Sequence, residues 1–430
     1  MKNKMQPYVG PRSFERKDQA IFFGRDKEAR DLLSLIIANN VVLVYSPSGA
    51  GKTSLINAKL IPLLKKEDFE VLPLARVRSM TTPQINPEKI PNIYIFNSLM
   101  KWFEGKYEVE RLAKMSMVDF LNERDHKRDN DGLLLPRAII FDQFEELFTW
   151  HLDRWKDRAG FFEQVSRTLE KDSLLRIVFV MREDHIAKLD PYVHLLPNTF
   201  IHFHIDRMRK DAALLAVKGP LNMTDKSFAE GVAEKLVENL LKIRIETRPG
   251  DTVWVPGEFV EALQLQVVCQ SVWQKLAEKE KQITLDHIEK DGNIDQALSK
   301  FYEDTIQEAK IYVDEERIRR WFEDVLITSM RTRGTVYRGP QSTGGISNSV
   351  IDILEDMHLI RAEWRAGARW YELTHDRFID PILASNNAFS LKIKGVTEIE
   401  NTRVIANEYI IDAEHAWGLK NYNDSIQKYQ

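Results

Sequence analysis

Short, continuous apolar runs alternate with amphipathic stretches over the first half of the chain. Between the runs lie helical patterns such as IYIFNSLMKWF (93–103) and WKDRAGFFEQVSRTLEK (155–171). The alternation predicts a parallel sheet wound with helices, whose ligands bind beyond the carboxyl ends of the strands. The runs predicted to be strands are VVLVYS (41–46), EVLPLARV (70–77, weakened by Pro73), RAIIFD (137–142), RIVFVMR (176–182) and FIHFHI (200–205).

A loop of small residues follows the first apolar run and leads into a helical pattern that starts at Lys52. Glycines in such a loop let backbone N–H groups surround a phosphate, and the helix N-terminus adds its positive dipole. Lys52 would contact the β- and γ-phosphates, and the Thr53 hydroxyl would bind Mg²⁺. The predicted nucleotide-binding residues of this P-loop are Ser46, Pro47, Ser48, Gly49, Ala50, Gly51, Lys52, Thr53 and Ser54.

Ser46 stands where the usual pattern has its first glycine. That position often needs an unusual backbone angle, so we expect serine to cost on the order of 1 kcal/mol there. The substitution leaves Lys52, Thr53 and the two later glycines in place.

Three carboxylates follow the third apolar run. Asp142 ends that run and is expected to hold Mg²⁺ through water. Either Glu145 or Glu146 can polarise the attacking water, and we favour Glu145. The other is then an acidic residue stabilised by the dipole at a helix N-terminus.

Arg182 ends the fourth apolar run, beside the strand that carries the magnesium carboxylate. An arginine in this place can stabilise the γ-phosphate. An ordinary ion pair with Glu183 or Asp184 is the alternative interpretation.

The second half of the chain changes to mainly helical patterns. Helical periodicity covers GVAEKLVENLLKIR (231–244) and LQLQVVCQSVWQKLAEKE (263–280), with turn residues between them at 246–258. Further on, two helical stretches precede LIRAEWRAGARWYELT (359–374), two alternating runs joined at Ala366–Gly367. Helices followed by such a hairpin indicate a winged helix.

Arg361, Arg365 and Arg369 lie in this hairpin, and winged helices often bind DNA. A half-exposed hairpin with charged residues facing water explains the arginines without DNA. The chain has 61 Lys+Arg against 65 Asp+Glu and a formal charge of −4, which does not favour a nucleic-acid partner.

The composition and the N-terminal sequence indicate in which cellular compartment the protein works. A single cysteine, Cys269, excludes an internal disulfide framework and fits a reducing compartment. We find no signal-peptide core at the N-terminus and no apolar run that approaches the length of a membrane span, and we expect a cytoplasmic protein.

Taken together, the motifs resemble the STAND NTPases, the regulatory P-loop ATPases that include the NB-ARC and NACHT switches. The resemblance is strongest to a prokaryotic branch whose domain begins with a YVGPRPF-type segment, here PYVGPRSFERKDQAIFFGRDKEA (7–29). It covers about residues 7–385. It implies that Phe23, Gly24 and Arg25 lie under the adenine, that Pro220 of the helical lid contacts the base, and that His375, followed by Asp376, contacts the β-phosphate of ADP.

The expected architecture has five parts. An α/β P-loop NTPase domain with a parallel sheet flanked by helices (23–205) follows an N-terminal segment (1–22). A helical lid (206–300) and a winged-helix domain (301–388) come next. The helical C-terminal segment (389–430) resembles, at 414–430, the start of a tetratricopeptide repeat.

The expected function is an ATP-dependent signalling switch with slow ATPase activity, in prokaryotic stress response or antiphage defence. It would use ATP, ADP and Mg²⁺, form homo-oligomers in the ATP state, and contact a protein trigger or effector through its C-terminal helices. Two alternatives stay open: a DNA-binding ATPase of the origin-recognition type, and a non-catalytic scaffold in which Ser46 marks a decayed site.

Overall fold

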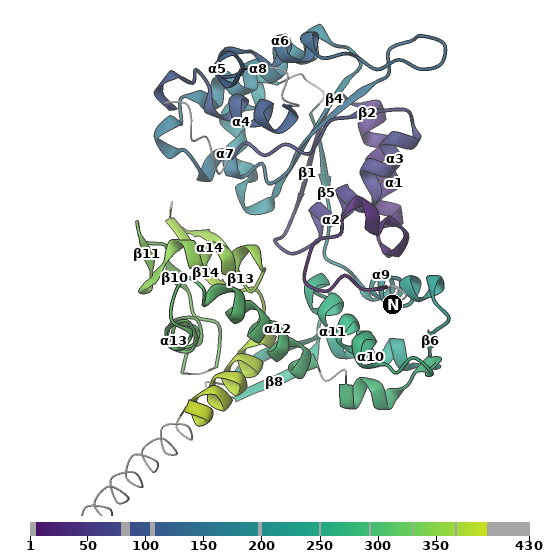
Figure 1. Ribbon diagram of the computed structural model, residues 1–430, viewed down its shortest axis with the longest axis vertical. Helices are drawn as coiled ribbons and strands as arrows, with labels where there is room; N and C mark the ends of the chain where they lie inside the picture. The colour runs from purple at the N-terminus through teal and green to yellow at the C-terminus, as the bar shows by residue number, and fades with distance from the viewer. Residues whose placement is uncertain are drawn as a thin grey trace, which may run out of the picture.

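An α/β unit lies above a second, mainly helical unit in the computed structural model (Figure 1). The structure describes residues 6–78, 87–103, 108–196, 200–248, 251–291, 294–329, 331–365 and 368–393. The predicted repeat at 414–430, the joint at Ala366–Gly367 and all of the C-terminal segment beyond residue 393 lie outside these residues. Within them, no helix is both long and apolar enough to cross a bilayer.

The α/β unit is built on a five-stranded parallel sheet in the order β2-β3-β4-β1-β5. Along β1 the side chains alternate between two apolar cores: Val41 and Leu43 face one, and Val42 and Val44 face the other. The strands are β1 (Val41–Ser46), β2 (Glu70–Val71), β3 (Arg137–Phe141), β4 (Leu175–Arg182) and β5 (Phe200–His204).

The second predicted strand, 70–77, is wrong in length. Regular pairing in β2 ends at Val71, and beyond it only Ala75 forms a bridge with Phe141. Pro73 has no N–H to donate to the neighbouring strand, so the chain leaves the ladder there.

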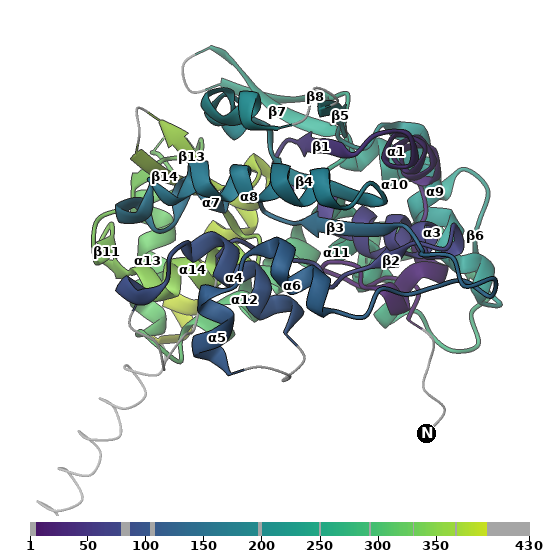
Figure 2. The same ribbon diagram turned by 90° about the horizontal axis from the view of Figure 1, so that it is seen from above.

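Helices cover both faces of the sheet. Figure 2 shows α1 and α3 on one side and α4, α5 and α6 on the other. The first group contains α1 (Asp26–Ala38), α2 (Lys52–Leu55), a π-helical turn (Ile56–Leu60) and α3 (Ile61–Lys66). The second contains α4 (Ile93–Trp102), α5 (Val109–Lys114), α6 (Met117–Glu123), α7 (Glu146–Thr149) and α8 (Asp157–Lys171).

The lower unit has one continuous apolar core that extends from Met208 to Ile382 and includes Tyr8. The predicted boundary at residue 300 falls inside α12, which therefore belongs to both predicted parts. The helices are α9 (Lys210–Lys218), α10 (Val232–Leu240), α11 (Ala262–Lys275), α12 (Ile294–Ala309), α13 (Glu315–Val325), α14 (Asn348–Asp356) and a last helix at 379–393.

The hairpin predicted at 359–374 is present as two antiparallel strands, joined by a third at one edge. It follows α13 and α14, the two helices predicted before it, and we call residues 301–388 the hairpin unit. Its strands are β10 (Val336–Tyr337), β13 (Ile360–Arg365) and β14 (Ala368–Leu373). A short pair in the same unit joins β11 (Ser342–Thr343) to β12 (Ile346–Ser347). A short pair in the lid joins β6 (Ser227–Phe228) to β9 (Gln282–Ile283).

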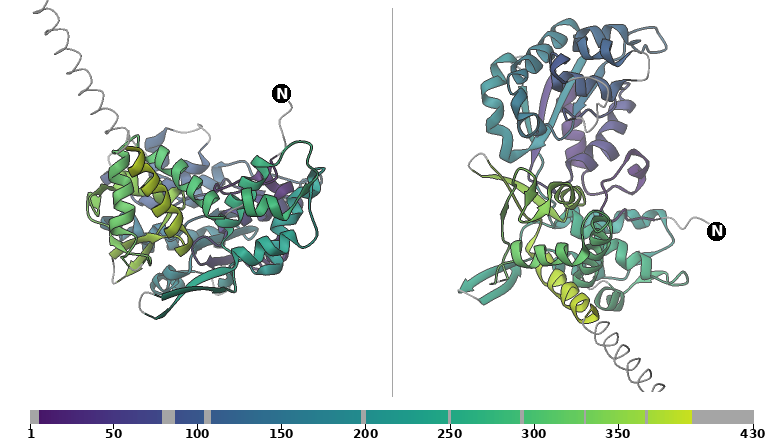
Figure 3. Two further views of the ribbon diagram at one scale, coloured as in Figure 1. Left: turned by 90° about the horizontal axis from the view of Figure 1, so that it is seen from below. Right: turned by 60° about the vertical axis from the view of Figure 1, so that its left-hand side comes forward.

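A second hairpin corrects the prediction for the lid. The predicted helix 231–244 ends at Leu240, and β7 (Lys242–Arg248) pairs with β8 (Asp251–Pro256) where only turn residues were expected. The hairpin projects from the lower unit (Figure 3, right). Ile243 and Ile245 lie opposite Val255 and Val253, so β-branched residues with a period of two override the helical pattern.

Candidate nucleotide-binding site

The P-loop has the backbone that a phosphate-binding loop requires. Strand β1 ends at Ser46 and α2 starts at Lys52. Between them Gly49 and Gly51 adopt left-handed φ angles of 79° and 91°, which glycine alone adopts freely.

Ser46 is not strained, contrary to expectation. It lies in the ladder of β1, in register with Arg182 of β4, and the described non-glycine residues with positive φ do not include it. The position is ordinary strand, so serine fits it without the predicted cost.

Lys52 is held by the loop that it follows. Its Nζ donates to Ser46 Oγ at 2.9 Å and to the carbonyl oxygens of Ser46 and Pro47, each at 3.2 Å. Burial lowers the pKa of Lys52, while the nearby charge of Glu145 opposes this shift. The Ser46 hydroxyl thus supplies an acceptor that glycine lacks.

The two predicted magnesium ligands lie side by side. Thr53 Oγ1 donates to Asp142 Oδ2 at 3.0 Å, and the other Asp142 oxygen accepts from the Gln143 N–H, also at 3.0 Å. Burial raises the pKa of Asp142. A hydroxyl and a carboxylate at the carboxyl ends of the strands are hard oxygen donors of the kind that Mg²⁺ prefers, so these residues fit the ion.

Glu145 and Glu146 face different partners. Glu145 Oε2 accepts from the Arg182 N–H at 3.2 Å; burial raises its pKa, and Lys52 is the largest opposing charge. Glu146 lies 4.0 Å from Arg78, and burial raises its pKa to about 8. Glu145 is therefore the carboxylate on the Lys52 side of the site.

Arg182 lines the pocket and also makes the predicted ion pair. Its Nε and Nη2 donate to Asp184 at 3.0 and 2.9 Å. To bind a phosphate the guanidinium has to share or leave this carboxylate.

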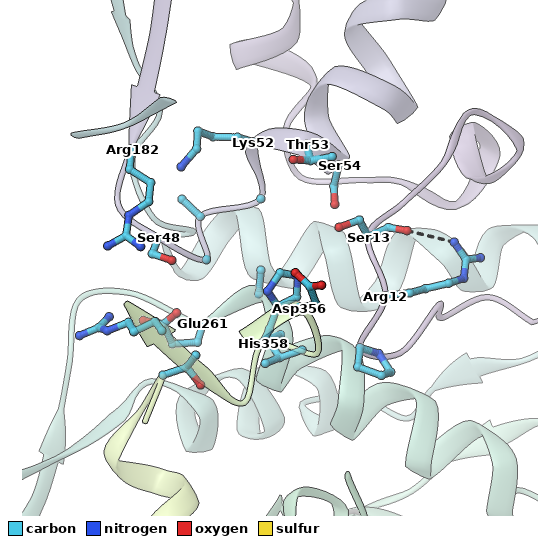
Figure 4. A pocket seen from close by; sticks show the side chains of 18 of the residues that line it. Arg12, Ser13, Ser48, Lys52, Thr53, Ser54, Arg182, Glu261, Asp356 and His358 are labelled. Carbon is cyan, nitrogen blue, oxygen red and sulfur yellow. Dashed lines mark hydrogen bonds between the residues drawn. The ribbon is translucent and has the colours of Figure 1, made fainter. Parts of the chain in front are cut away.

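One pocket with a volume of about 300 Å³ connects the P-loop with the N-terminal segment, the lid and the hairpin unit. In Figure 4, Lys52, Thr53 and Ser54 lie on one side, and Glu261, Asp356 and His358 lie opposite. We call residues 48–54, together with Asp142, Gln143, Glu145, Glu146 and Arg182, the motif wall. The opposite wall is formed by residues 10–14 and 261–266 with Asp356, His358, Arg361, Arg369 and His375.

Most of the opposite wall was missed at the sequence level. The YVGPRSF segment is part of the family resemblance, but the resemblance implies no site role for residues 10–14. Its hydrogen bonds show what it does: Tyr8 OH donates to Val217 O at 2.6 Å, the Val9 N–H donates to Gln266 Oε1 at 3.2 Å, and the Phe14 N–H donates to Ser54 Oγ at 3.2 Å. The segment ties the lid to the P-loop helix.

Only part of the FFGR element lines the pocket, and the rest packs against the lid. Phe23 lines the pocket, and its ring lies so close to Gly219 that a Cβ there would come within 2.4 Å of it. Gly24 has φ 87° and allows close approach to the Ala212 carbonyl of α9.

Arg25 lines the pocket but is held by its surroundings. It donates to Ala50 O at 3.2 Å, to Asp206 O at 2.8 Å and to Glu28 at 2.7 Å, so it joins the P-loop to the start of the lid. Among the described residues, the predicted site residues that do not line the pocket are Gly24, Ser46, Pro47 and Pro220. Pro220 is buried next to Gly219.

His375 lines the pocket with a defined tautomer. The Arg377 N–H donates to His375 Nδ1 at 3.0 Å. A neutral ring that accepts at Nδ1 carries its proton on Nε2, where it is a donor. The partner that fixes the tautomer is the Arg377 backbone, and the side chain of Asp376 lies outside the described residues.

The arginines of the hairpin turn inward. Arg361 Nε donates to Glu372 at 2.7 Å and Arg369 pairs with Glu355, and both arginines line the pocket. The side chain of Arg365 lies outside the described residues. The expectation that charged hairpin residues face water is wrong for Arg361 and Arg369.

The loop between β1 and α2, Lys52, and the Thr53–Asp142 pair on a parallel sheet define a P-loop NTPase. The model of the family Novel STAND NTPase 1 matches residues 7–381, and the chain belongs to this family. No curated protein matches the chain.

Several solved structures are similar at low identity. A Walker-type ATPase of Pyrococcus abyssi is 14% identical with a TM-score of 0.47, and the match covers 88% of this chain and 99% of that one. ORC2 of Aeropyrum pernix in ADPNP–ADP complexes is 14% identical with a TM-score of 0.42, and the match covers 85% of this chain and 95% of that one. Cdc6p of Pyrobaculum aerophilum is 12% identical with a TM-score of 0.40, and the match covers 85% of this chain and 94% of that one.

Proposed function

We propose that this protein is an ATP-dependent signalling switch with slow ATPase activity. In the ADP state the lid and the hairpin unit close over the nucleotide, and in the ATP state they open and the protein forms homo-oligomers. The observation that carries the proposal is the single pocket with walls from the P-loop, the lid and the hairpin unit. A ligand in this pocket contacts all three parts, and it shifts the equilibrium between a closed and an open conformation if it binds one of them more tightly than the other.

His375 supports the closed ADP state. Its Nε2–H is a donor on the hairpin unit, and the ring is oriented by the Arg377 backbone. A hydrogen bond from this nitrogen to a β-phosphate would favour the closed arrangement.

Hydrolysis would return the switch to the ADP state. Thr53 and Asp142 would hold Mg²⁺, which neutralises phosphate charge when bound. Glu145 is placed to orient the attacking water because it lies on the Lys52 side of the site. Arg182 would stabilise the γ-phosphate after exchanging its contact with Asp184.

The biological setting that we propose follows from the family: stress response or antiphage defence in a prokaryotic cytoplasm, with a protein trigger or effector. The origin-recognition alternative gains no support, because Arg361 and Arg369 are paired with carboxylates inside the hairpin unit.

The test is the molar mass of the full chain in solution with ADP, with ATP and with a non-hydrolysable ATP analogue. We expect a monomer with ADP and a larger assembly with either triphosphate. His375→Ala should form the assembly at lower triphosphate concentration, while the exposed His194→Ala serves as a control that leaves it unchanged. A mass that is identical in all nucleotides would refute the switch.

A further inference from the structure

Gln264 is a buried amide at the nucleotide pocket. It lies in the first turn of α11, lines the nucleotide pocket and is 1% exposed. Within the described part of the chain, neither its Nε2 nor its Oε1 has a hydrogen-bond partner. Buried polar side chains nearly always have partners, so an amide with two open positions in a pocket points to a ligand.

The neighbouring polar residues of α11 are already engaged. Gln266 Oε1 accepts the Val9 N–H at 3.2 Å, and the Gln270 amide packs against Gly10. These two contacts fasten the N-terminal segment to the lid. Gln264 makes no comparable contact.

The first turn of α11 lies against the P-loop. Glu261, the residue before the helix, has Oε2 3.6 Å from the position of a Cβ built on Gly49, and its carboxylate lies 3.7 Å from Arg207. Gln264 is three residues further on and therefore on the same side of the helix. In Figure 4 Glu261 faces the P-loop across the pocket, which places this side of α11 toward the nucleotide.

We propose that Gln264 binds the nucleoside part of the nucleotide, an inference that rests on nucleotide binding at the P-loop. A carboxamide offers a donor and an acceptor side by side, and both positions are open here. Phosphate oxygens are acceptors only and would leave Oε1 without a partner. A base edge and a ribose diol both present a donor beside an acceptor, and a glutamine amide can pair with either.

This contact gives the lid a direct hold on the nucleotide. Pro220, the lid residue expected at the base, does not line the pocket in the described residues, whereas Gln264 does. Binding of the nucleoside would then draw α11, and with it the N-terminal segment bound to Gln266, toward the P-loop.

Titration calorimetry on the full chain tests the proposal with Gln264→Leu and a control, Gln274→Leu, at an exposed position of the same helix. We expect Gln264→Leu to weaken ADP binding by about tenfold, in line with the loss of one two-point amide contact. Pyrophosphate, which lacks the nucleoside, should bind equally well to wild type and variant. The Tm of the nucleotide-free variant should be equal or higher, because the change removes two unsatisfied buried atoms.

Further nucleotides separate the two sources of the contact. If the ribose is the partner, 2′,3′-dideoxy-ADP should bind wild type and Gln264→Leu alike. If the base edge is the partner, the tenfold difference should persist with 2′,3′-dideoxy-ADP.

Three results would overturn the inference while leaving the proposed function in place. Equal ADP affinity in wild type and Gln264→Leu would show that Gln264 does not contact the nucleotide. A loss of pyrophosphate affinity as large as the loss of ADP affinity would show that Gln264 contacts phosphate. A lowered Tm together with weaker binding of every ligand would mean a structural role. Wild type that binds no nucleotide at all would instead refute the proposed function and the inference with it.

Discussion

The two walls of the pocket differ in how the chain builds them. The motif wall comes from short contiguous stretches that follow β1, β3 and β4, such as 48–54 after β1. The opposite wall collects residues from 10–14, 261–266 and 356–375, which are remote from one another in sequence.

The two walls also offer a nucleotide different contacts. The motif wall carries Lys52, Thr53 and Asp142, the groups suited to phosphate and metal. The opposite wall carries Gln264 and His375 on parts of the chain outside the α/β unit. We propose that the first wall carries out the chemistry and that the second wall couples the nucleotide to a change of conformation, and substitutions on either side test that division.

The largest effect is expected from the motif wall. Lys52→Ala should weaken ADP binding by about 100-fold or more, because it removes a charged donor to the phosphates. Titration calorimetry measures this, with exposed Lys66→Ala as a control of equal charge change. Full ADP affinity in Lys52→Ala would show that the site is misassigned.

Glu145→Gln should separate chemistry from binding. We expect steady-state hydrolysis to fall by about 100-fold with ADP affinity unchanged, because in the proposed mechanism the carboxylate orients water and does not hold the nucleotide. Glu146→Gln, whose carboxylate faces Arg78, should lower hydrolysis much less. The reverse order of the two variants would assign the role to Glu146.

Glu146 should make stability depend on pH. Burial raises its pKa from 4.5 to about 8, so between these values the folded state binds a proton that the unfolded state has released. The free energy of unfolding therefore falls as pH rises through this window, by about 1–2 kcal/mol between pH 6 and 7.5.

Urea denaturation of nucleotide-free wild type and Glu146→Gln at several pH values isolates this contribution. The glutamine variant should lose less stability toward pH 8, while exposed Glu163→Gln should follow wild type. Parallel curves for wild type and Glu146→Gln would contradict the raised pKa.

The smallest effect is expected at Ser46. Ser46→Gly should lower stability by about 0.5–1 kcal/mol, because glycine costs entropy in a strand and removes an acceptor of Lys52. ADP affinity should change less than about threefold. A more stable Ser46→Gly protein would show that serine is strained there after all.

The position of the motif wall at one edge of the sheet could be predicted from the sequence because its signals are local. A strand, a glycine-bearing loop and a helix follow one another within 41–60, and Asp142 and Arg182 each end an apolar run, so spacing alone placed them at one edge of the sheet. Even here the backbone of Ser46 was misjudged, because the expectation came from the position in the motif and not from the strand pairing with β4.

The opposite wall had no comparable local signal. Residues 10–14 reach the pocket because Tyr8 and Val9 are bound to the lid, 209 and 257 residues away in sequence, and because Phe14 is bound to Ser54. Gln264 lies in a helix whose apolar pattern gives no reason to single it out. Arg361 and Arg369 face inward because Glu372 and Glu355 attract them, which depends on the packed hairpin unit.

Hydrogen–deuterium exchange with and without ADP tests most directly whether one nucleotide contacts both walls. We predict slower exchange on ADP binding in residues 46–55 and, at the same ADP concentration, in residues 9–14, in the first turns of α11 and in residues 374–378. Slower exchange confined to 46–55 would contradict the account, because the nucleotide would then be bound by the α/β unit alone.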